Sequence, residues 1–478
     1  MNKGKKLINT LAALSGEITV RSIEEMQLKN GKTRFDICVN HAVHSAPCSC
    51  GSKMIKKHGT KSAWAMHIPQ GKRSTTRIHY DRQRFKCKTC GATFLEDISW
   101  IHNGSHLTVS LFDCIASDVR TLMTKNDIAR VNAVTVHFVD YVLEELKPPI
   151  PSQLPEVICI DETFSQVEEV LNEKTSWVRF VTNLSNGQTG ELLDILPFRN
   201  KKNLVRYFNK NFTYHNRCNV KHLCCDGADY YISLAEKCFP NATVCLDNFH
   251  VSNYVRSGLA SVRIKQQNYL LSKSETKNDR YFRESIDLKH LSHKLDTSAF
   301  HQKLFWRDKY AKYAARIKHH LFECPELKDA YFMLQYYYLI FHMDYDFKQK
   351  AEDLNTWISI FRKSSSEAIS AAVRSVELHL PYIHNAWKSG YSNATCEGNN
   401  NLIQTLKNMS FGIHSFDYFR TRALLIAGSP GVSRNRKKPF NTSLDCTSFF
   451  FEEAPSLKDY VLAYDWTNPR VDMSGKGV

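Results

Sequence analysis

The middle of the chain contains short apolar runs separated by a stretch with helical spacing. Residues 220–225 form an apolar run of strand length that ends at Asp226, and residues 243–246 form a second run that ends at Asp247. Between the two runs, apolar residues recur at helical spacing, at Tyr230, Leu234 and Cys238. In open α/β sheets, chemistry collects at the carboxyl ends of such strands, so both aspartates are candidate catalytic residues. One aspartate before a glycine is more often only a turn residue, but two at equivalent strand ends favour catalysis.

Two other segments carry carboxylates in a similar setting. Residues 157–160 form another β-rich apolar run, which follows the proline-rich linker 148–151 and ends at Asp161. Far downstream, Glu397 precedes a stretch with apolar residues at helical spacing, over residues 402–409. We therefore expect Glu397 in the first turns of a helix, from which it points back at a sheet.

The segments between these acids predict a mixed sheet. Strands are expected over residues 177–184 and 191–196, joined by an Asn186-Gly187 turn, and a helix over residues 201–211. The predicted order is three strands, a helix, a strand, a helix and a strand. This is the order of an RNase H-like α/β core, whose first three strands are antiparallel and whose later strands are parallel. Residues 252–389 are almost free of glycine and rich in helical runs, which predicts a large helical insertion into this core. Its aromatic residues are expected in its interior, with a base-stacking surface as the alternative.

Four cysteines near the N-terminus stand in two close pairs, Cys48 with Cys50 and Cys87 with Cys90. Paired thiolates beside glycine-bearing turns complete tetrahedral sites, so the pattern predicts a zinc ribbon with structural Zn²⁺. The first pair is C-x-C, tighter than the C-x-x-C of the second, and His44 or His58 is an alternative ligand. Four unligated surface thiols are the competing interpretation. Most of the 15 cysteines in the chain are expected to be reduced thiols.

Basic and apolar residues alternate between the two cysteine pairs, in the manner of a β-ribbon that contacts phosphates. The expected DNA-binding residues of this ribbon are Lys72, Arg73, Arg82 and Arg84. After the ribbon, residues 126–131 and 134–139 are expected to form two short helices joined by a turn, a pattern that resembles a helix-turn-helix. Its second helix would enter the major groove, and Arg130 is a further expected DNA contact.

Charge and composition favour a nucleic-acid partner. Lys and Arg number 64 against 48 Asp and Glu, so the formal net charge is +16, which suits double-stranded DNA. Good solubility alone is the plainer explanation. No apolar run approaches the roughly 20 residues that cross a bilayer, and the N-terminal sequence lacks a signal-peptide core. A cytoplasmic, nucleoid-associated protein without membrane contact is therefore expected.

With 478 residues, the chain is too long for one ordinary core, and the expected fold class is α+β multidomain. The expected units are an N-terminal segment (1–40), a zinc-ribbon DNA-binding domain (41–100), a helix-turn-helix domain (101–150), the first part of an RNase H-like core (151–251), a helical insertion (252–389), the last part of the core with the glutamate helix (390–428) and a basic C-terminal tail (429–478). The basic residues in that tail are expected, by default, to be solvent-exposed charges.

The order of these features resembles the DDE transposases of the ISL-three family of bacterial insertion sequences. The resemblance is carried by RFKCKTCGATFLED, ICIDE, CCDGADYYISLAEKCFPNATVCLDNFHV and the late block SNATCEGNNNLIQTLKNMSFGIHSFDYFRTR. It covers most of the chain, and its specific parts are the FP-x-A block with D-x-FHV and the EG-x-NN-x-I block. The chain departs from the family's pattern in its C-x-C pair and at Asn248, where the family often has a basic residue.

The resemblance implies a catalytic triad of Asp161, Asp226 and Glu397 that holds Mg²⁺ or Mn²⁺ for phosphoryl transfer by a two-metal mechanism. Asp247 and His250 are secondary candidates. Asp247 also ends a strand of the same sheet and is the alternative second acid, but Asp226 is favoured because its strand is expected beside that of Asp161. His250 would contact a DNA phosphate or support the acids, with a packed histidine as the alternative.

The resemblance also implies a function. The chain would bind transposon terminal inverted repeats and target DNA, cut and join DNA strands, and act as a homo-oligomer, since two ends must be brought together. Arg420 and Arg422 would serve end binding. Two other classes compete: a catalytically inactive DNA-binding regulator derived from a transposase, and an RNase H-like nuclease without strand transfer. Retention of all three acids argues against the regulator, and the ribbon with the helix-turn-helix argues against the nuclease.

Overall fold

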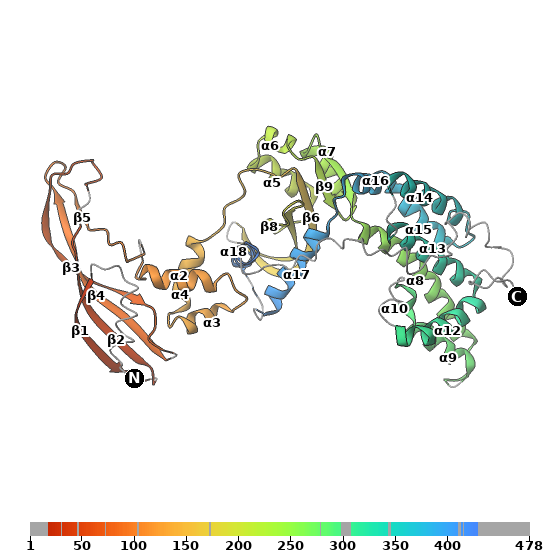
Figure 1. Ribbon diagram of the computed structural model, residues 1–478, viewed down its shortest axis with the longest axis horizontal. Coiled ribbons are helices and arrows are strands. Elements are labelled where there is room, and N and C mark those ends of the chain that lie inside the picture. The colour runs from red at the N-terminus through yellow and green to blue at the C-terminus, as the bar shows by residue number, and fades with distance from the viewer. Residues whose placement is uncertain are drawn as a thin grey trace.

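The computed structural model is an elongated molecule with a β-sheet at one end, a mixed α/β body in the middle and a helical body at the other end (Figure 1). It describes residues 18–29, 31–44, 47–71, 73–102, 105–171, 174–277, 279–297, 307–342, 346–409, 413 and 415–428. Lys72 and the tail from residue 429 therefore lie outside the described residues. Among the described helices, none is both long and apolar enough to span a membrane.

The N-terminal sheet has the strand order β1-β2-β4-β3, with β5 paired to β4. Its strands are β1 (Ile18–Gln27), β2 (Thr33–His41), β3 (Ile55–His67), β4 (Ser74–Cys87) and β5 (Thr93–Leu95). β2 pairs with β4 in parallel, and the other pairs are antiparallel. Ile37 and Val39 alternate with polar residues along β2 and are fully buried with Ile78 of β4. This period-two pattern places β1 and β2 in the same sheet as the ribbon, so the sheet extends across the boundary expected at residue 40.

Three helices follow the sheet: α2 (Val109–Asp118), α3 (Lys125–Val131) and α4 (Val136–Glu145). The hydroxyls of Thr108 and Thr124 cap α2 and α3, where they accept hydrogen bonds from backbone N–H groups three residues later. Apolar residues at helical spacing, such as Ile115 and Val139, are fully buried in the core that the three helices share. Two helices were predicted where α3 and α4 lie, but α4 extends past the expected end at residue 139 because its buried apolar positions continue to Leu143.

The central sheet has the strand order β10-β9-β6-β7-β8. Its strands are β6 (Val157–Leu171), β7 (Lys174–Asn186), β8 (Leu192–Leu196), β9 (His222–Cys225) and β10 (Thr243–Leu246). β6, β7 and β8 are antiparallel neighbours, and β9 and β10 run parallel to β6, as predicted. β6 continues well past the expected end at residue 160, because β7 pairs with it as far as Leu171. A bulge interrupts this pairing between Phe164 and Val167.

Helices cover both faces of the central sheet. On one face lie α5 (Lys201–Asn211), α6 (Tyr214–Cys218) and α7 (Asp229–Cys238), and on the other lie α17 (Ala394–Met409) and α18 (Phe416–Ala427). Ile160 packs with Phe208 in the first core, and Val181 packs with Ile403 in the second. The parallel part of the sheet is thus buried on both sides, which is typical of strands that run in parallel.

The helical body connects β10 to α17. Its helices are α8 (Asn248–Lys273), α9 (Arg280–His290), α10 (Ser292–Leu295), α12 (Arg307–Glu323), α13 (Pro325–His342), α14 (Phe347–Phe361), α15 (Glu367–Leu378) and α16 (Leu380–Ser389). Tyr337 and Trp357 are buried in its core, and the Trp357 indole N–H donates to the Met333 carbonyl at 2.8 Å. These aromatic side chains form the interior, as predicted. The chain returns to the sheet through α16, whose Asn385 donates to the Val244 carbonyl of β10 at 3.1 Å.

A buried arginine joins the three N-terminal helices to the central body. Arg422 of α18 has no exposed surface, and its guanidinium donates to the carbonyls of Thr121 at 2.7 Å and Met123 at 2.9 Å. It also donates to the Tyr418 hydroxyl at 3.0 Å. Arg422 was expected to contact transposon ends, but its charge is buried inside the protein, and its Nη2 group donates to the turn between α2 and α3. Its observed role is to fasten that turn to α18.

We predict that Arg422→Ala lowers the free energy of unfolding by about 2–4 kcal/mol, because it leaves buried carbonyls unpaired and removes hydrogen bonds to a charged group. Arg374→Ala is the matched control, since Arg374 is exposed and pairs with the exposed Glu367. It should change stability by no more than about 0.5 kcal/mol. Denaturant unfolding followed by circular dichroism measures both. Equal small shifts in the two variants would contradict the assigned role.

Candidate active site and cysteine cluster

Three aspartates come together because their strands are in register. Cys159 of β6 lies opposite Cys224 of β9, and Cys224 lies opposite Cys245 of β10. Two residues after each cysteine, the chain reaches an aspartate: Asp161, Asp226 and Asp247. Neighbouring strands lie about 4.8 Å apart, so the three carboxyl groups stand at the same level of adjacent strands.

Helix α17 brings Glu397 to the same edge. Cys396 is fully buried against the sheet, and its thiol donates to Asn183 Oδ1 of β7 at 2.9 Å. On the other side of Glu397, Asn399 Nδ2 donates to the Ser185 hydroxyl at 2.6 Å. Glu397 itself is half-buried in the first turn of α17, as predicted. Contacts on both sides of it therefore hold the start of this helix on the sheet.

Asp161 is buried, and both of its carboxyl oxygens accept hydrogen bonds. Oδ1 accepts from the Glu162 N–H at 2.7 Å, and Oδ2 accepts from Asn400 Nδ2 at 3.0 Å. The Asn400 amide is held in this orientation, since its own oxygen accepts from the Thr163 hydroxyl and the Asn183 side-chain amide. Asn400 thus orients Asp161 from the helix that carries Glu397.

The acids are close enough to affect one another's ionisation. Burial raises the pKa of Asp161 to about 6, and the nearby charges of Asp226 and Glu397 add to the rise. Burial also raises the pKa of Asp247, and the charge of Asp161 adds to that rise. Burial likewise raises the pKa of Glu397, and the charge of Asp247 adds to it. His250, in the first turn of α8, lies near enough to oppose the pKa rise of all three acids electrostatically. Raised carboxyl pKa values of this origin are typical of functional sites.

Asp226 and Asp247 differ in their surroundings. Asp226 is half-buried, its Oδ1 accepts from the Ala228 N–H at 3.0 Å, and its strand pairs directly with that of Asp161. Asp247 is only 5% exposed, and its strand lies one place further out. This strand order is the predicted one. The charge of Asp226 nevertheless adds to the pKa rise of Asp161, and the charge of Asp161 adds to the pKa rise of Asp247.

The oxygen atoms at this edge fit a hard divalent cation. Within the described part of the chain, Asp247 Oδ2 and both polar side-chain atoms of Asn393 are buried without a hydrogen-bond partner. The Asn393 backbone amide lies close to the Asp247 carboxylate and lowers its pKa. Buried polar atoms without partners are costly, and carboxylate and amide oxygens are ligands that Mg²⁺ accepts. The four acids therefore supply oxygen atoms of the kind that divalent cations bind, although among the described residues only the cysteine cluster brings three or more potential ligand atoms within 4.8 Å of one another.

Glu162 forms a second network that the sequence pattern did not indicate. Its carboxylate accepts from Arg199 Nη1 at 3.0 Å and from the Tyr230 hydroxyl. Successive residues of a strand point to opposite faces, so Glu162 lies on the other side of the sheet from Asp161. The adjacent Asp161-Glu162 pair was visible in the sequence, but not the continuation of β6 that separates the two side chains.

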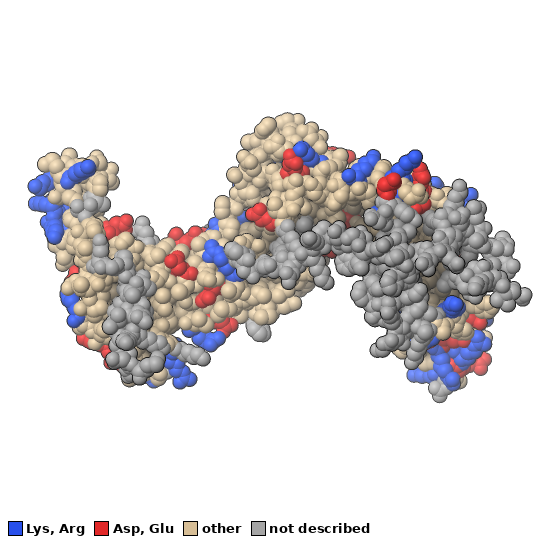
Figure 2. Space-filling model, viewed as in Figure 1, with Lys and Arg blue, Asp and Glu red and all other residues tan. Residues whose placement is uncertain are grey.

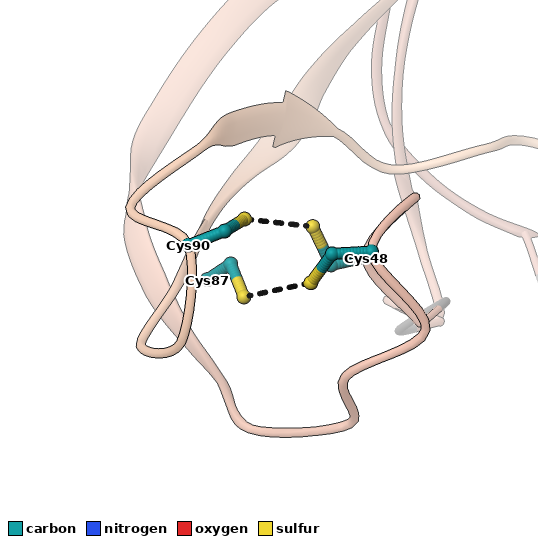
Figure 3. A group of neighbouring side chains, drawn as sticks. Cys48, Cys87 and Cys90 are labelled. Atoms are coloured by element: carbon teal, nitrogen blue, oxygen red, sulfur yellow. Dashed lines mark hydrogen bonds between the residues drawn. The ribbon is translucent and has the colours of Figure 1, made fainter.

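The four N-terminal cysteines form a compact cluster. The sulfur atoms of Cys48, Cys50, Cys87 and Cys90 all lie within 4.8 Å of one another. Figure 3 shows the side chains of Cys87 and Cys90 facing Cys48. Cys48 Sγ lies 3.5 Å from Cys90 Sγ, and Cys50 Sγ lies 3.7 Å from Cys87 Sγ. The cluster includes neither His44 nor His58. It therefore provides four thiols that could bind zinc.

Local backbone geometry shapes each cysteine pair. Gly51 and Gly91 directly follow the pairs with φ of 81° and 76°, a conformation that favours glycine. The backbone amides of Cys90 and Thr89 lower the pKa of Cys87 to about 6, although burial opposes this. A thiol that ionises near neutral pH is ready to ligate a metal. The C-x-C spacing of the first pair thus does not prevent the four sulfurs from meeting.

The expected DNA-binding arginines lie in different settings. Arg73 and Arg84 are exposed, Arg130 is exposed beside Asp127, and Arg82 is half-buried with its Nε donating to the Glu96 carbonyl at 2.8 Å. Figure 2 shows Lys and Arg gathered at the far end of the N-terminal sheet. Strand β3 of this sheet carries the exposed lysines Lys56, Lys57 and Lys61. The sheet thus presents a basic surface.

Two other parts of the expected DNA interface are Arg420 and helix α4. Arg420 donates to Asp194 Oδ1 at 2.6 Å and to the Pro148 carbonyl at 3.1 Å, with only 12% of its side chain exposed. It is therefore held inside the protein, like Arg422. Helix α4 contains no Lys or Arg, and its exposed charged residues are Asp140, Glu144 and Glu145. An acidic exposed surface repels DNA phosphates.

A transposase family model, of the DDE type found in ISL-three insertion sequences, matches residues 158–423. The match spans more than half of the chain, which belongs to this transposase family. The family implies an enzyme that cleaves and transfers DNA with divalent metal ions. The match runs from β6 to α18 and contains all four acids, whereas the N-terminal sheet lies outside it. None of the curated proteins compared matches the chain.

We predict that the purified chain contains about one zinc ion, because four thiolates complete a tetrahedral site. Replacing Cys87 and Cys90 together by serine should reduce the zinc content to near zero. Cys218→Ser is the control, since Cys218 is half-buried on α6 and is not part of the cluster. Elemental analysis by mass spectrometry gives the zinc content of each protein. A cluster that stays free of metal in the wild type would refute the zinc assignment.

We predict that Asn400→Ala destabilises the fold by about 1–3 kcal/mol, because Asp161, Thr163 and Asn183 all lose a hydrogen-bond partner. The variant should also bind Mn²⁺ more weakly, since the Asp161 carboxylate is no longer oriented. Asn401→Ala is the matched control, as Asn401 is the next residue and is exposed. Thermal unfolding and Mn²⁺ titration calorimetry measure the two effects. The same result for both alanine variants would exclude a positioning role for Asn400.

Proposed function

We propose that this chain binds the terminal inverted repeats of an insertion sequence and catalyses metal-dependent DNA strand cleavage and strand transfer. One observation carries the proposal: four acidic side chains from distant segments meet at one edge of the central sheet, and the pKa values of three are raised. Like charges gathered in a partly buried site favour the binding of cations. Membership of a transposase family supports DNA as the substrate.

The strand arrangement supports an RNase H-like core. β6, β7 and β8 form the antiparallel part, β9 and β10 join in parallel beside β6, and helices lie on both faces. We assign this core to residues 151–251 and 390–428, with the helical body, residues 252–389, inserted between β10 and α17. In this assignment Glu397 returns to the sheet only after the whole insertion.

Asp161, Asp226 and Glu397 are the proposed catalytic triad. When bound, a pair of divalent cations activates the attacking water or 3′-hydroxyl and stabilises the leaving oxygen. Asp161 and Asp226 would hold the cations from adjacent strands and Glu397 from helix α17. Asp247 is the alternative second acid, and its burial beside Glu397 supports a share in cation binding. His250 would contact a DNA phosphate or offset part of the negative charge.

The N-terminal sheet is the proposed DNA-binding surface. The cysteine cluster would hold a structural Zn²⁺ that makes the basic β-ribbon rigid, and Arg73 and Arg84 would contact phosphates. Helices α3 and α4 have the order of a helix-turn-helix, but the acidic exposed surface of α4 favours the ribbon over α4 as the principal phosphate contact. Two chains or more would act together, because two transposon ends must be joined, on the chromosomal DNA of the nucleoid.

Two alternative functions make different predictions. A catalytically inactive regulator would bind the terminal repeats without needing carboxylates, and the four clustered acids argue against it. An RNase H-like nuclease would cut DNA but would not join a 3′-end to a target. The basic sheet outside the matched family region supports binding of specific ends, which a simple nuclease does not need.

We predict Mg²⁺- or Mn²⁺-dependent cleavage of a labelled terminal-repeat duplex, followed by joining of its 3′-end to a target plasmid. Asp161→Asn, Asp226→Asn and Glu397→Gln should each slow cleavage by on the order of 10³-fold or more, because each removes a ligand of the reacting cations. Asp229→Asn is the control, since Asp229 is exposed three residues after Asp226. Gel assays separate cleavage from strand transfer.

The outcomes of this assay distinguish the three functions. Binding without cleavage in the wild type identifies the regulator, and cleavage without joining identifies the nuclease. If Asp247→Asn abolishes cleavage while Asp226→Asn does not, Asp247 is the second acid of the triad.

A further inference from the structure

The β6–β7 ribbon extends beyond the parallel strands from about the level of Asp161 onward. β9 pairs with β6 only from Val157 to Cys159, whereas β7 pairs with β6 as far as Leu171. Asp161 therefore stands at the point where β6 leaves the cover of β9. From there onward the ribbon borders the acidic edge of the sheet.

Two phenylalanines lie exposed on this ribbon close to Asp161. Phe164 and Phe180 are paired in register, and their rings meet edge to face with centroids 5.5 Å apart. Phe164 is 43% exposed and Phe180 is 36% exposed. The bulge that follows Phe164 contains Gln166 with φ of 54°, and bulges of this kind re-aim side chains beside active sites.

A cation lies over each of the two rings. Arg199 Cζ is 4.7 Å from the centroid of the Phe180 ring, and Lys407 Nζ is 4.7 Å from that of Phe164. Arg199 is also held by Glu162, the neighbour of Asp161, and 56% of its side chain is exposed. We call Phe164, Phe180, Arg199 and Lys407 together the aromatic platform.

The aromatic platform lies within reach of a DNA strand at the acids. Phe164 follows Asp161 by three residues, which is roughly 10 Å along a strand and about three stacked base steps. Phe164 lies on the face opposite Asp161, but Lys407 reaches its ring from α17, the helix that also carries Glu397. The face of the sheet with Phe164 and the face with Asp161 are thus both accessible from the free edge of β6. A DNA strand that passes this edge can contact both.

We propose that the aromatic platform stacks an unpaired base of the DNA strand whose phosphate lies at the acids. Every base has a π-face that stacks on aromatic rings and guanidinium planes, and Arg and Lys neutralise the adjoining phosphates. This charge complementarity selects a nucleic-acid strand over an apolar partner. The proposal rests on the proposed function, because it assigns the platform's base to the strand that is cut.

A forked terminal-repeat duplex, unpaired by three bases at the cleavage site, tests the aromatic platform. In the Asp161→Asn background, which keeps the probe intact, the chain should bind this fork more tightly than the matched paired duplex. Replacing Phe164 and Phe180 together by leucine keeps apolar packing but removes the π-faces. We expect this variant to lose roughly tenfold of its affinity for the fork while its affinity for the paired duplex stays unchanged.

Photocrosslinking gives an independent readout of the same contact. 5-Iodouracil placed at each unpaired position should crosslink to Phe164 or Phe180 from one or two positions only, as identified by mass spectrometry. Phe322→Leu is the control for both assays, since Phe322 is 69% exposed on α12 in the helical body. It should leave fork affinity and crosslinking as in the wild type.

The contrary outcomes are distinct. If the double leucine variant keeps the fork preference, or if crosslinks map away from the ribbon, the aromatic platform does not bind a base. If the variant instead changes only the sedimentation coefficient of the free protein, the patch is a contact between subunits and the proposal is wrong. A wild type that cuts the terminal repeat without any preference for forks overturns the platform alone. A wild type that neither binds nor cuts the repeat overturns the proposed function and the platform with it.

Discussion

Repulsion between the carboxylates at one edge of the central sheet is the constraint on which the rest of the site depends. Asp161, Asp247 and Glu397 are each buried enough for their pKa values to rise. Such a group of like charges is stable only where the surrounding structure determines the position of each member. Strand register does this for the aspartates, and the packing of Cys396 against the sheet does it for Glu397.

Side chains that are not themselves acidic complete this support. Asn400 donates to Asp161 while Thr163 and Asn183 hold the Asn400 amide in place. The support is therefore shared between the sheet and α17, two parts of the chain separated by the whole helical body. Neither part can hold the acids alone, because each supplies hydrogen bonds that the other needs.

Much of the central body could be predicted because its signals are local. β10, α5 and the strand directions follow from short apolar runs, a helical period and an Asn-Gly turn, and Glu397 lies in the predicted helix turn. The extension of β6 was missed because its residues after Asp161 are largely polar, and only pairing with β7 makes them a strand. The burial of Arg420 and Arg422 was missed for a related reason. A basic residue looks like a DNA contact until its tertiary partners are known, here Asp194 and the carbonyls of the α2–α3 turn.

The route of the chain through the helical body has a mechanical consequence. α8 begins directly after Asp247, Leu246 packs into the helical core, and α16 leads back to the start of α17 just before Glu397. The helical body is thus joined to the sheet at two points, one next to Asp247 and one shortly before Glu397. A displacement of the helical body relative to the sheet would therefore act on the spacing between those two carboxylates through the backbone itself.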